Sequence, residues 1–326
     1  IMLARSFTGR SLVLKAAGGW HGSQPLALRG TRFGADGFGG MDSQGLPLGV
    51  ESETLVTRFN DLEDLRARFR EHGDRLACVI LEPCLGTSGF MPASPEYLRE
   101  ARALTEQHGA LLILDEIISG FRFCAGGLQK LYGVRADLST YGKIIGGGMP
   151  ASAVTGRADV LDLAGKATGR RVLFDGGTFS AHPAAMLAGR VMLQHLAEQE
   201  SAIYPQLAAK GERLRRGVEA AFSRAGMLVR CTGGGNAVVP GSSLIQVHFP
   251  LCDDTSLDSP DLVWDPQLCD AFLREQALRL GLLLRDVNVS HGLGAVSTAH
   301  DEAALAQTLD AFAWVAEQMA EARKAW

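Results

Sequence analysis

The chain has 326 residues, 46% hydrophobic and 21% charged, a balance typical of a folded globular protein with room for one large domain and a smaller one. This composition excludes a disordered or collagen-like chain, and no apolar run approaches the roughly 20 residues of a membrane-spanning helix. The formal net charge of -4 gives no electrostatic reason to expect nucleic acid or an anionic membrane as partner.

The six cysteines are scattered along the chain, without the C-x-x-C pairs or nearby histidines of a zinc site. We therefore expect free, buried thiols and no metal ligands. The first residues, IMLARSFTGR, lack the hydrophobic core and the cleavage pattern of a signal peptide. These features together predict a cytoplasmic protein.

The first predicted strand lies in residues 11–22, SLVLKAAGGWHG, where an apolar run leads into a glycine-rich turn. The stretch 29–49 follows and holds too many glycines for regular structure. Loops of this length inside a compact domain are usually functional or mobile.

Residues 76–83, LACVILEP, and 110–116, ALLILDE, predict two buried strands on either side of a helix. Continuous apolar strands that alternate with helices indicate a parallel sheet covered on both faces. The sequence therefore predicts an α/β fold.

The helix between these strands is expected over residues 94–109. Ser94 is a suitable N-cap, Pro95 suits the first helical position, and the glycine at 109 ends the helix. Its apolar face should be formed by Leu98, Ala101 and Leu104.

The pattern changes after a helix expected at 183–198. Further helices are predicted at 211–226, at 266–281 and from 301 to the end, with a strand at 243–249. We assign residues 1–200 to a large domain and 201–326 to a smaller α+β domain.

One lysine stands out in the segment LSTYGKIIGGGMPASAVTGR, residues 138–157. Lysine serves as a nucleophile where it is accessible and partly neutral, and the small, uncharged neighbours of Lys143 suit that role. From this segment alone, a surface lysine beside a glycine-rich turn is the simpler interpretation.

Two acids, Asp115 and Glu116, end the second buried strand. Ligands bind at the carboxyl ends of parallel strands, where a carboxylate can hold a cationic ring nitrogen. Alternatively, one of these acids caps the next segment.

The lysine, the acid and the turn Trp20-His21-Gly22 together suggest pyridoxal phosphate as cofactor. This cofactor needs a lysine for its imine, an acid for its pyridine nitrogen and a flat side chain against its ring. Each signal is weak alone, and their combination is stronger.

Three blocks, LLILDEIISGFR, DLSTYGKIIGGGMPASAVTGR and FDGGTFSAHPAAMLAG, resemble signatures of the class-III pyridoxal-phosphate aminotransferases, most closely the glutamate-1-semialdehyde aminomutase-like branch. Similarity in LARSFTGR, GGWHG, ILEPCLGTSGFMP and AVSTAHDE extends this resemblance over nearly the whole chain. It implies the fold-type-I architecture, with a large domain built on a mostly parallel sheet flanked by helices and a small α+β C-terminal domain.

The resemblance also implies roles for individual residues. Lys143 would form the imine with the cofactor and then move the proton, and Asp115 would pair with the pyridinium nitrogen. Trp20 would stack on the ring, and Gly22 would let the backbone approach it. His21 remains open between shaping the turn and acting as a base.

Three further positions follow from the same resemblance. Thr178 matches the threonine that reaches the cofactor phosphate of the neighbouring subunit, which implies a homodimer with shared active sites. Glu82 would be a structural or site-edge acid close to the cofactor. The family's polar contact to the ring hydroxyl falls on Leu85 or Thr87, and only Thr87 could donate a hydrogen bond.

Several departures concern the phosphate and the substrate. The sequence opens inside a helix that in the family follows a phosphate-binding loop. Either the given chain is a fragment or processed form that lacks the N-terminal segment, or something else must hold the phosphate. Gly292 stands where the mutases have an acid, and no clear counterpart of their substrate serine follows Trp20. The cofactor-facing residues Lys143, Asp115 and Thr178 are nevertheless present.

We therefore expect a pyridoxal-phosphate-dependent aminotransferase that moves an amino group between an amine or amino acid and a carbonyl acceptor. The alternatives are glutamate-1-semialdehyde 2,1-aminomutase, a catalytically impaired cofactor-binding fragment, and one module of a larger biosynthetic synthase.

Overall fold

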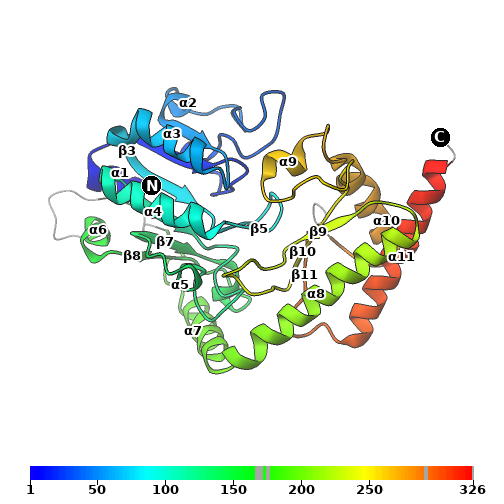
Figure 1. The fold of residues 1–326 in the computed structure, drawn as a ribbon. Helices are drawn as coiled ribbons and strands as arrows, with labels where there is room; N and C mark the ends of the chain where they lie inside the picture. Colours follow the sequence, from blue (N-terminus) through cyan, green and yellow to red (C-terminus); the bar gives the residue numbers. More distant parts are fainter. Residues whose placement is uncertain (166–171, 174–176, 290–292, 325–326) are drawn as a thin grey trace. The chain divides into compact units, whose positions relative to one another are not determined.

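The computed structural model describes residues 1–165, 172–173, 177–289 and 293–324. The chain packs into two compact units, drawn in Figure 1: Ile1–Gly86 with Ala93–Glu200, and Thr87–Pro92 with Ser201–Trp326. None of the helices in the described part of the chain combines the length and the apolar character needed to cross a bilayer. The division into two functional domains at residue 200 stays a prediction.

The first unit is built on a six-stranded sheet in the order β2-β1-β3-β6-β7-β8. All neighbouring pairs are parallel except β7 and β8, which confirms the predicted mostly parallel sheet. The strands in this order are β2 (Thr54–Thr57), β1 (Leu12–Ala16), β3 (Leu76–Leu81), β6 (Leu111–Asp115), β7 (Leu138–Tyr141) and β8 (Ala153–Gly156). Every residue of β1, β3 and β6 is buried, as expected for strands covered on both faces.

Helices and short turns of this unit connect and cover the strands. They are α1 (Met2–Thr8), η1 (Pro25–Ala27), α2 (Val50–Glu53), α3 (Leu62–His72), η2 (Gly73–Arg75), α4 (Pro95–His108), α5 (Gln129–Tyr132), η3 (Lys143–Gly146), α6 (Ala158–Leu161), η4 (Asp162–Ala164) and α7 (Pro183–Glu198). The short strand β4 (Cys84–Leu85) follows β3.

Both faces of the sheet are covered. One core cluster joins α1 and α6 to four neighbouring strands, and its members include Leu3, Val13, Ile80, Ile113, Leu138 and Val160. The helix α4 contacts β3 and β6 and packs against α3. Side chains alternate between the two faces along a strand, so the complete burial of β1, β3 and β6 shows that both faces are covered.

The predicted helix caps of α4 are confirmed. Ser94 Oγ accepts the backbone N–H of Tyr97 at 3.1 Å, and Pro95 occupies the first helical position. Gly109 ends the helix in the left-handed conformation with φ of 64°. Local side-chain chemistry therefore fixes both ends of α4.

The apolar face of α4 differs in part from the prediction. Leu98 and Ala101 are buried as expected, whereas Leu104 is only half-buried. Tyr97 and Thr105 are buried in addition. Thr105 can be buried because its hydroxyl donates to the carbonyl of Ala101 in the preceding turn, which the apolar pattern does not reveal.

The stretch 29–49 forms no helix or strand, as expected, and holds only the isolated bridges Arg29–Met41 and Gly34–Gly37. Gly30 has a φ of 68°, and a Cβ atom there would lie 2.6 Å from the carbonyl oxygen of Phe38. A glycine is therefore required where this loop turns back on itself.

The second unit contains a three-stranded antiparallel sheet in the order β11-β10-β9. Its strands are β9 (Arg230–Thr232), β10 (Leu244–His248) and β11 (Leu293–Ala295), and β5 (Met91–Pro92) lies in the inserted segment. Its helices are α8 (Glu200–Arg224), α9 (Pro260–Trp264), the π-helix η5 (Leu273–Leu278), α10 (Arg279–Leu283) and α11 (Glu302–Lys324). One core cluster joins α8, β10 and α11 and includes Phe222, Val247 and Phe312.

The predicted strand at 243–249 and the C-terminal helix are confirmed by β10 and α11. The helix predicted at 211–226 is the second half of the longer α8. The helix predicted at 266–281 is wrong at its start, because Asp265 and Asp270 bind the backbone N–H groups of Gln267 and Leu273. Such side-chain bonds favour turns over a continuous helix.

The expectation of buried thiols holds for four of the six free cysteines, Cys78, Cys84, Cys124 and Cys269. It is wrong for Cys252, which is exposed, and Cys231 is half-buried. Composition and spacing alone did not distinguish these environments.

The N-cap of α4 provides a test of the fold. Replacing Ser94 with Ala removes the acceptor for the Tyr97 N–H, and we expect the free energy of unfolding to fall by about 1 kcal/mol. Urea unfolding followed by circular dichroism measures the change. Ser94→Asp keeps an acceptor and should retain most of the stability; equal losses in both variants would contradict the capping role.

Candidate functional site

The predicted site residues of the first unit lie at the carboxyl ends of four neighbouring parallel strands. The strands β1, β3, β6 and β7 are adjacent in the sheet, and each ends at or just before one of the candidates. In this order the candidates are Trp20 and His21, Glu82, Asp115 and Lys143. This edge of a parallel sheet is where α/β proteins bind ligands.

Asp115 is the last residue of β6 and is only 5% exposed. Its Oδ1 accepts the backbone N–H of Ile117 at 3.1 Å and the hydroxyl of Thr140 at 2.9 Å, and its Oδ2 lies 2.8 Å from Nδ1 of His21. Burial alone would raise the pKa of Asp115. The hydrogen bonds from His21, Ile117 and Thr140 outweigh this effect and lower the pKa. Asp115 is therefore an ionised, fixed carboxylate.

Glu116, next in sequence, has a different role. Its carboxylate accepts the Ser119 hydroxyl at 2.7 Å and the backbone N–H groups of Leu128 and Gln129 at 3.0 and 3.1 Å. These bonds satisfy donors at the start of α5. The capping alternative considered for the two acids therefore describes Glu116, while Asp115 faces His21.

His21 is buried against Asp115. Burial lowers the pKa of His21, although the hydrogen bond and charge of Asp115 oppose this shift. In the neutral ring, the proton belongs on Nδ1, which then donates to Asp115 Oδ2. Nε2 has no hydrogen-bond partner among the described residues and would lie 3.0 Å from a Cβ at Gly19. This enclosed position favours a role in orienting Asp115 over proton transfer.

The other residues of this turn have open surroundings. The Trp20 side chain is exposed to 39%, so its ring is accessible to a ligand. Gly22 has a φ of 80°, which strains residues with a Cβ, and the space around its missing Cβ is open. Both observations fit a backbone that lies close to a flat ligand.

Glu82 follows β3 and is 3% exposed. Its Oε1 accepts the backbone N–H of Trp20 at 2.8 Å, and its Oε2 accepts that of Gly86 at 3.0 Å. Burial and the charge of Asp115 raise the pKa of Glu82 to about 8, against the opposing effects of these two bonds and of Lys15. Glu82 thus holds the turn that carries Trp20.

Lys143 begins η3 directly after β7 and is exposed. Its φ of 50° lies in the left-handed region, which is uncommon for a residue with a Cβ and is often found at functional sites. The side chain is therefore accessible at the sheet edge where Asp115 ends the neighbouring strand.

The glycines after Lys143 allow η3 to approach α7 closely. A Cβ at Gly147 would lie 2.8 Å from the carbonyl oxygen of Ala188, and one at Gly189 would lie 2.7 Å from that of Ile145. Part of the glycine-rich pattern is thus explained by packing.

The remaining predicted positions have different environments. Thr178 is exposed in the turn that precedes α7. Thr87 is half-buried and belongs to the second unit, while Leu85 is fully buried in β4. Gly292 lies outside the described residues.

Sequence reasoning missed Thr140 and Ile117, which both bind Asp115. Thr140 is the register partner of Asp115 on β7, and Ile117 also lies beside Gly142, where a Cβ would be 3.4 Å from its Cγ2. Only the pairing of the strands brings Thr140 to Asp115. No local motif signals this contact.

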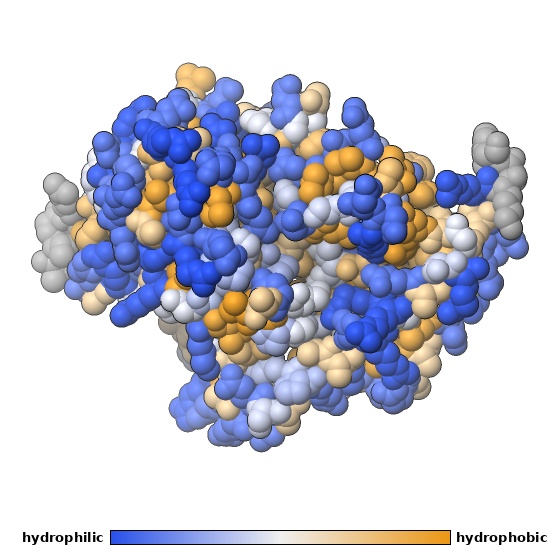
Figure 2. Space-filling model, viewed as in Figure 1, coloured by the Kyte–Doolittle hydropathy of each residue, from blue (hydrophilic) through white to orange (hydrophobic). Residues whose placement is uncertain are grey.

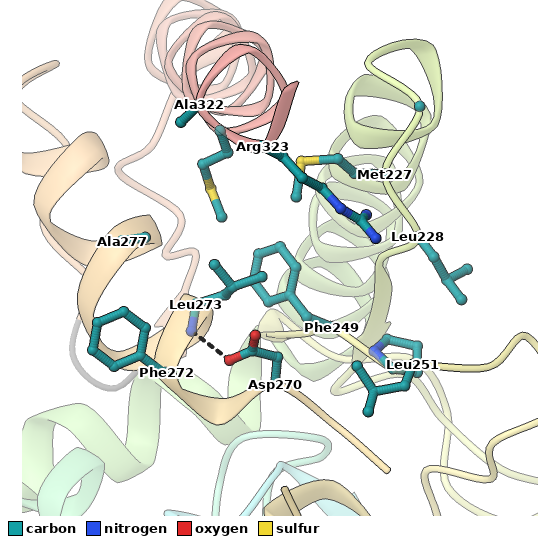
Figure 3. Close-up of a pocket in the computed structure, with 13 residues that line it drawn as sticks. Met227, Leu228, Phe249, Leu251, Asp270, Phe272, Leu273, Ala277, Ala322 and Arg323 are labelled. Atoms are coloured by element: carbon teal, nitrogen blue, oxygen red, sulfur yellow. Dashed lines mark hydrogen bonds between the residues drawn. The ribbon is translucent and has the colours of Figure 1, made fainter. Parts of the chain in front are cut away.

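A pocket of about 700 Å³ lies within the second unit and is mainly lined by apolar side chains, among them Phe249, Phe272 and Leu273 (Figure 3). Its Asp270 carboxylate is engaged by the backbone N–H of Leu273 (Figure 3). The pocket contains none of the predicted site residues, and it offers no nucleophile. In the described residues no cluster of three acidic, histidine or cysteine side chains could hold a metal ion.

The model of the aminotransferase class-III family matches residues 1–239. The chain belongs to this family. Glutamate-1-semialdehyde 2,1-aminomutase from Laribacter hongkongensis is 36% identical over 313 residues, which cover 95% of this chain and 69% of that protein.

Solved structures agree with this assignment. An omega-transaminase from Sphaerobacter thermophilus is 32% identical with a TM-score of 0.83, covering 98% of this chain and 71% of that one. A transaminase with PLP bound is 29% identical with a TM-score of 0.81, covering 98% and 70%. The fold is that of the fold-type-I PLP-dependent transaminases, and the chain belongs to an aminotransferase family. The predicted family and fold class are confirmed.

The raised pKa of Glu82 predicts how stability varies with pH. Because the folded protein holds this proton more tightly than the unfolded chain, folding takes up a proton between the ordinary pKa of 4.5 and about 8. The stabilisation of the fold by the proton on Glu82 is therefore fully present below pH 4.5 and is lost as the pH rises to 8.

We therefore expect the unfolding free energy of the wild type to fall relative to that of Glu82→Gln as the pH rises from 5 to 8. Urea unfolding of both proteins at several pH values measures it. A difference that stays constant over this range would contradict the raised pKa.

Proposed function

We propose that this protein is a pyridoxal-phosphate-dependent aminotransferase with Lys143 as its catalytic residue. The observation that carries the proposal is the pairing of the neighbouring strands β6 and β7. The first of them ends at the ionised, buried Asp115, and the second is followed by the exposed Lys143. A fixed carboxylate and an accessible amine at one sheet edge are the two groups that this cofactor requires.

The residues present fit the cofactor. Oδ1 of Asp115 already accepts two hydrogen bonds, from Ile117 and Thr140, whereas Oδ2 accepts one, from His21. A carboxylate oxygen has two acceptor positions, so Oδ2 can accept one further N–H. The pyridine nitrogen would take this position. Trp20 and Gly22 would lie against the ring.

When bound, pyridoxal phosphate supplies an electron sink for the bonds at the substrate carbon. Asp115 would keep a proton on the pyridine nitrogen, because its lowered pKa keeps it anionic. Nζ of Lys143 would hold the cofactor covalently and, once released, hold and move a proton. His21 would keep Asp115 in place, and the buried Glu82 would hold the turn of Trp20.

The substrates proposed are an amine or amino acid as donor and a carbonyl compound as acceptor. Glutamate-1-semialdehyde 2,1-aminomutase activity is the second candidate, because a relative that bears this name is 36% identical over most of the chain. Incubation with glutamate-1-semialdehyde as the sole substrate separates the two. A mutase moves the amino group within that molecule, whereas a transaminase requires a separate acceptor for net turnover. A catalytically impaired fragment would bind the cofactor and do neither.

We also propose that the protein forms a homodimer with shared active sites and that it is cytoplasmic. Figure 2 shows a mainly hydrophilic surface with separate apolar patches. In the first unit, α7 exposes Leu187 to 61% and Val191 to 57%, and Phe179 just before it is exposed to 80%. Such a group of exposed apolar side chains favours a partner surface. Thr178 lies next to Phe179, so a partner on this surface would meet it.

The catalytic role of Lys143 is tested by absorbance. The purified protein with pyridoxal phosphate should show a visible absorbance band that borohydride removes, and Lys143→Ala should lack this band. Lys130→Ala, which replaces another exposed lysine of the same unit, should keep it. The proposal fails if Lys143→Ala retains the band. If the band forms but no amine donor converts the cofactor to the pyridoxamine form, the proposed aminotransferase activity is refuted. The protein would then be a catalytically impaired, cofactor-binding fragment.

The dimer is tested at α7. Leu187→Lys places a charge on the exposed apolar surface and should shift the protein to a monomer, as measured by light scattering after gel filtration. Leu280→Lys is the control, since Leu280 is also exposed, to 59%, in α10 of the second unit. A monomeric wild type would refute the proposal.

Shared sites predict complementation between inactive variants. Lys143→Ala and Thr178→Ala protomers should each be impaired, but mixed dimers should regain one intact site, about a quarter of all sites after random exchange. Turnover after mixing and dilution measures this recovery. Absence of recovery in mixtures that do form heterodimers would show that Thr178 does not serve the partner's site.

A further inference from the structure

Lys15 is the fourth of the five residues of β1 and is completely buried. Its ammonium lies among four uncharged oxygen atoms: the carbonyls of Gly19 at 2.9 Å, Ala27 at 3.0 Å and Arg29 at 2.8 Å, and the hydroxyl of Thr31 at 2.9 Å. Burying a charge is costly unless hydrogen bonds satisfy it, and here acceptors surround all three N–H groups.

One of these acceptors belongs to the peptide group between Gly19 and Trp20. The carbonyl of this group accepts from Lys15, and Thr31 Oγ1 also approaches it at 3.3 Å. The N–H of the same group donates to Oε1 of Glu82 at 2.8 Å. A peptide group is planar, so binding it at both ends fixes the orientation of the whole plane.

This plane sets the direction in which the chain enters Trp20 and His21. Space around it is small, because a Cβ at Gly19 would lie 3.0 Å from His21 Nε2 and 3.1 Å from the carbonyl of Ala16. The His21 ring then reaches Asp115 at 2.8 Å. A rotation of the Gly19–Trp20 plane would therefore displace both the exposed indole and the bond to Asp115.

The three other oxygen ligands of Lys15 extend its influence along the chain. Ala27, Arg29 and Thr31 lie 12 to 16 residues after Lys15, so the loop from the turn to Thr31 folds around one cation. The ammonium holds this loop by gathering its oxygen atoms, as a bound metal ion would. Unlike a metal ion, it is attached to β1 of the six-stranded sheet.

We propose that Lys15 and Glu82 are positioning residues that clamp the Gly19–Trp20 peptide group and thereby set Trp20 and His21 for the cofactor and for Asp115. The inference rests on the proposed function, since it assigns the clamp to a cofactor site. Core stability alone gives no reason for this arrangement, because apolar side chains of similar volume avoid the cost of burying charges.

The test uses two measurements on the purified protein labelled with 5-fluorotryptophan. Fluorine NMR reports the surroundings of Trp20, whose resonance is assigned with Trp20→Phe, and titration with pyridoxal phosphate gives the dissociation constant. Glu82→Gln replaces one acceptor by an amide NH₂, and Thr31→Val removes one ligand of Lys15 while the carbonyls remain. Lys15→Met removes the cation, and should it fail to fold, the two milder variants carry the test.

We expect Glu82→Gln and Lys15→Met to broaden or shift the Trp20 resonance and to weaken cofactor binding about tenfold or more, as the loss of a partner for a buried donor or acceptor does. Thr31→Val should have a smaller effect, and Thr31→Ser should restore the wild-type values. These results would support the clamp.

Arg215→Met is the matched control. Arg215 is a buried cation of the second unit that binds the carbonyls of Gly233, Ser242 and Leu244. Its loss should lower the thermal stability but leave the Trp20 resonance and the cofactor affinity unchanged.

The clamp is overturned if Glu82→Gln and Thr31→Val keep both the wild-type resonance and the wild-type affinity, or if Arg215→Met changes them equally. A wild type that does not bind pyridoxal phosphate would instead refute the proposed function. The Trp20 resonance of the variants would still decide whether the clamp exists.

Discussion

The carboxylate of Asp115 is the constraint on which the site of the first unit depends. It is buried at the end of β6, and it stays ionised because the ring of His21, the backbone of Ile117 and the hydroxyl of Thr140 all donate to it. These donors come from the turn after β1, from the chain after β6 and from β7. The carboxylate thus fixes three segments relative to one another, and the same bonds leave one acceptor position on Oδ2.

The pKa values of the two buried acids of this site are shifted in opposite directions. Asp115 is compensated by hydrogen bonds, whereas Glu82 has its pKa raised to about 8 by burial and by the negative charge of Asp115. Burial also lowers the pKa of Lys15, to about 8, and the charge of Lys15 partly opposes the rise in the pKa of Glu82. Groups with shifted pKa values that gather at one sheet edge are typical of functional sites.

Much of the first unit could be predicted because its signals are local. Continuous apolar runs marked β3 and β6, Ser94 and Gly109 marked the ends of α4, and strand ends located Asp115. The bond between Thr140 and Asp115 depends on the register of two strands 25 residues apart, and Lys15 reads in sequence as one polar residue in an apolar strand. Neither partner could be identified without the tertiary structure.

The glycines near Lys143 illustrate how one pattern serves two requirements. Gly147 is needed because α7 packs against its backbone, and Gly142 lies against Ile117. Glycine at such positions costs conformational entropy on folding, which contact with α7 offsets. The same close packing holds the backbone of η3 while Lys143, in its left-handed conformation, projects an exposed side chain. A closely packed backbone that carries an accessible amine suits the proposed role of Lys143, in which Nζ first holds a ligand and then moves a proton.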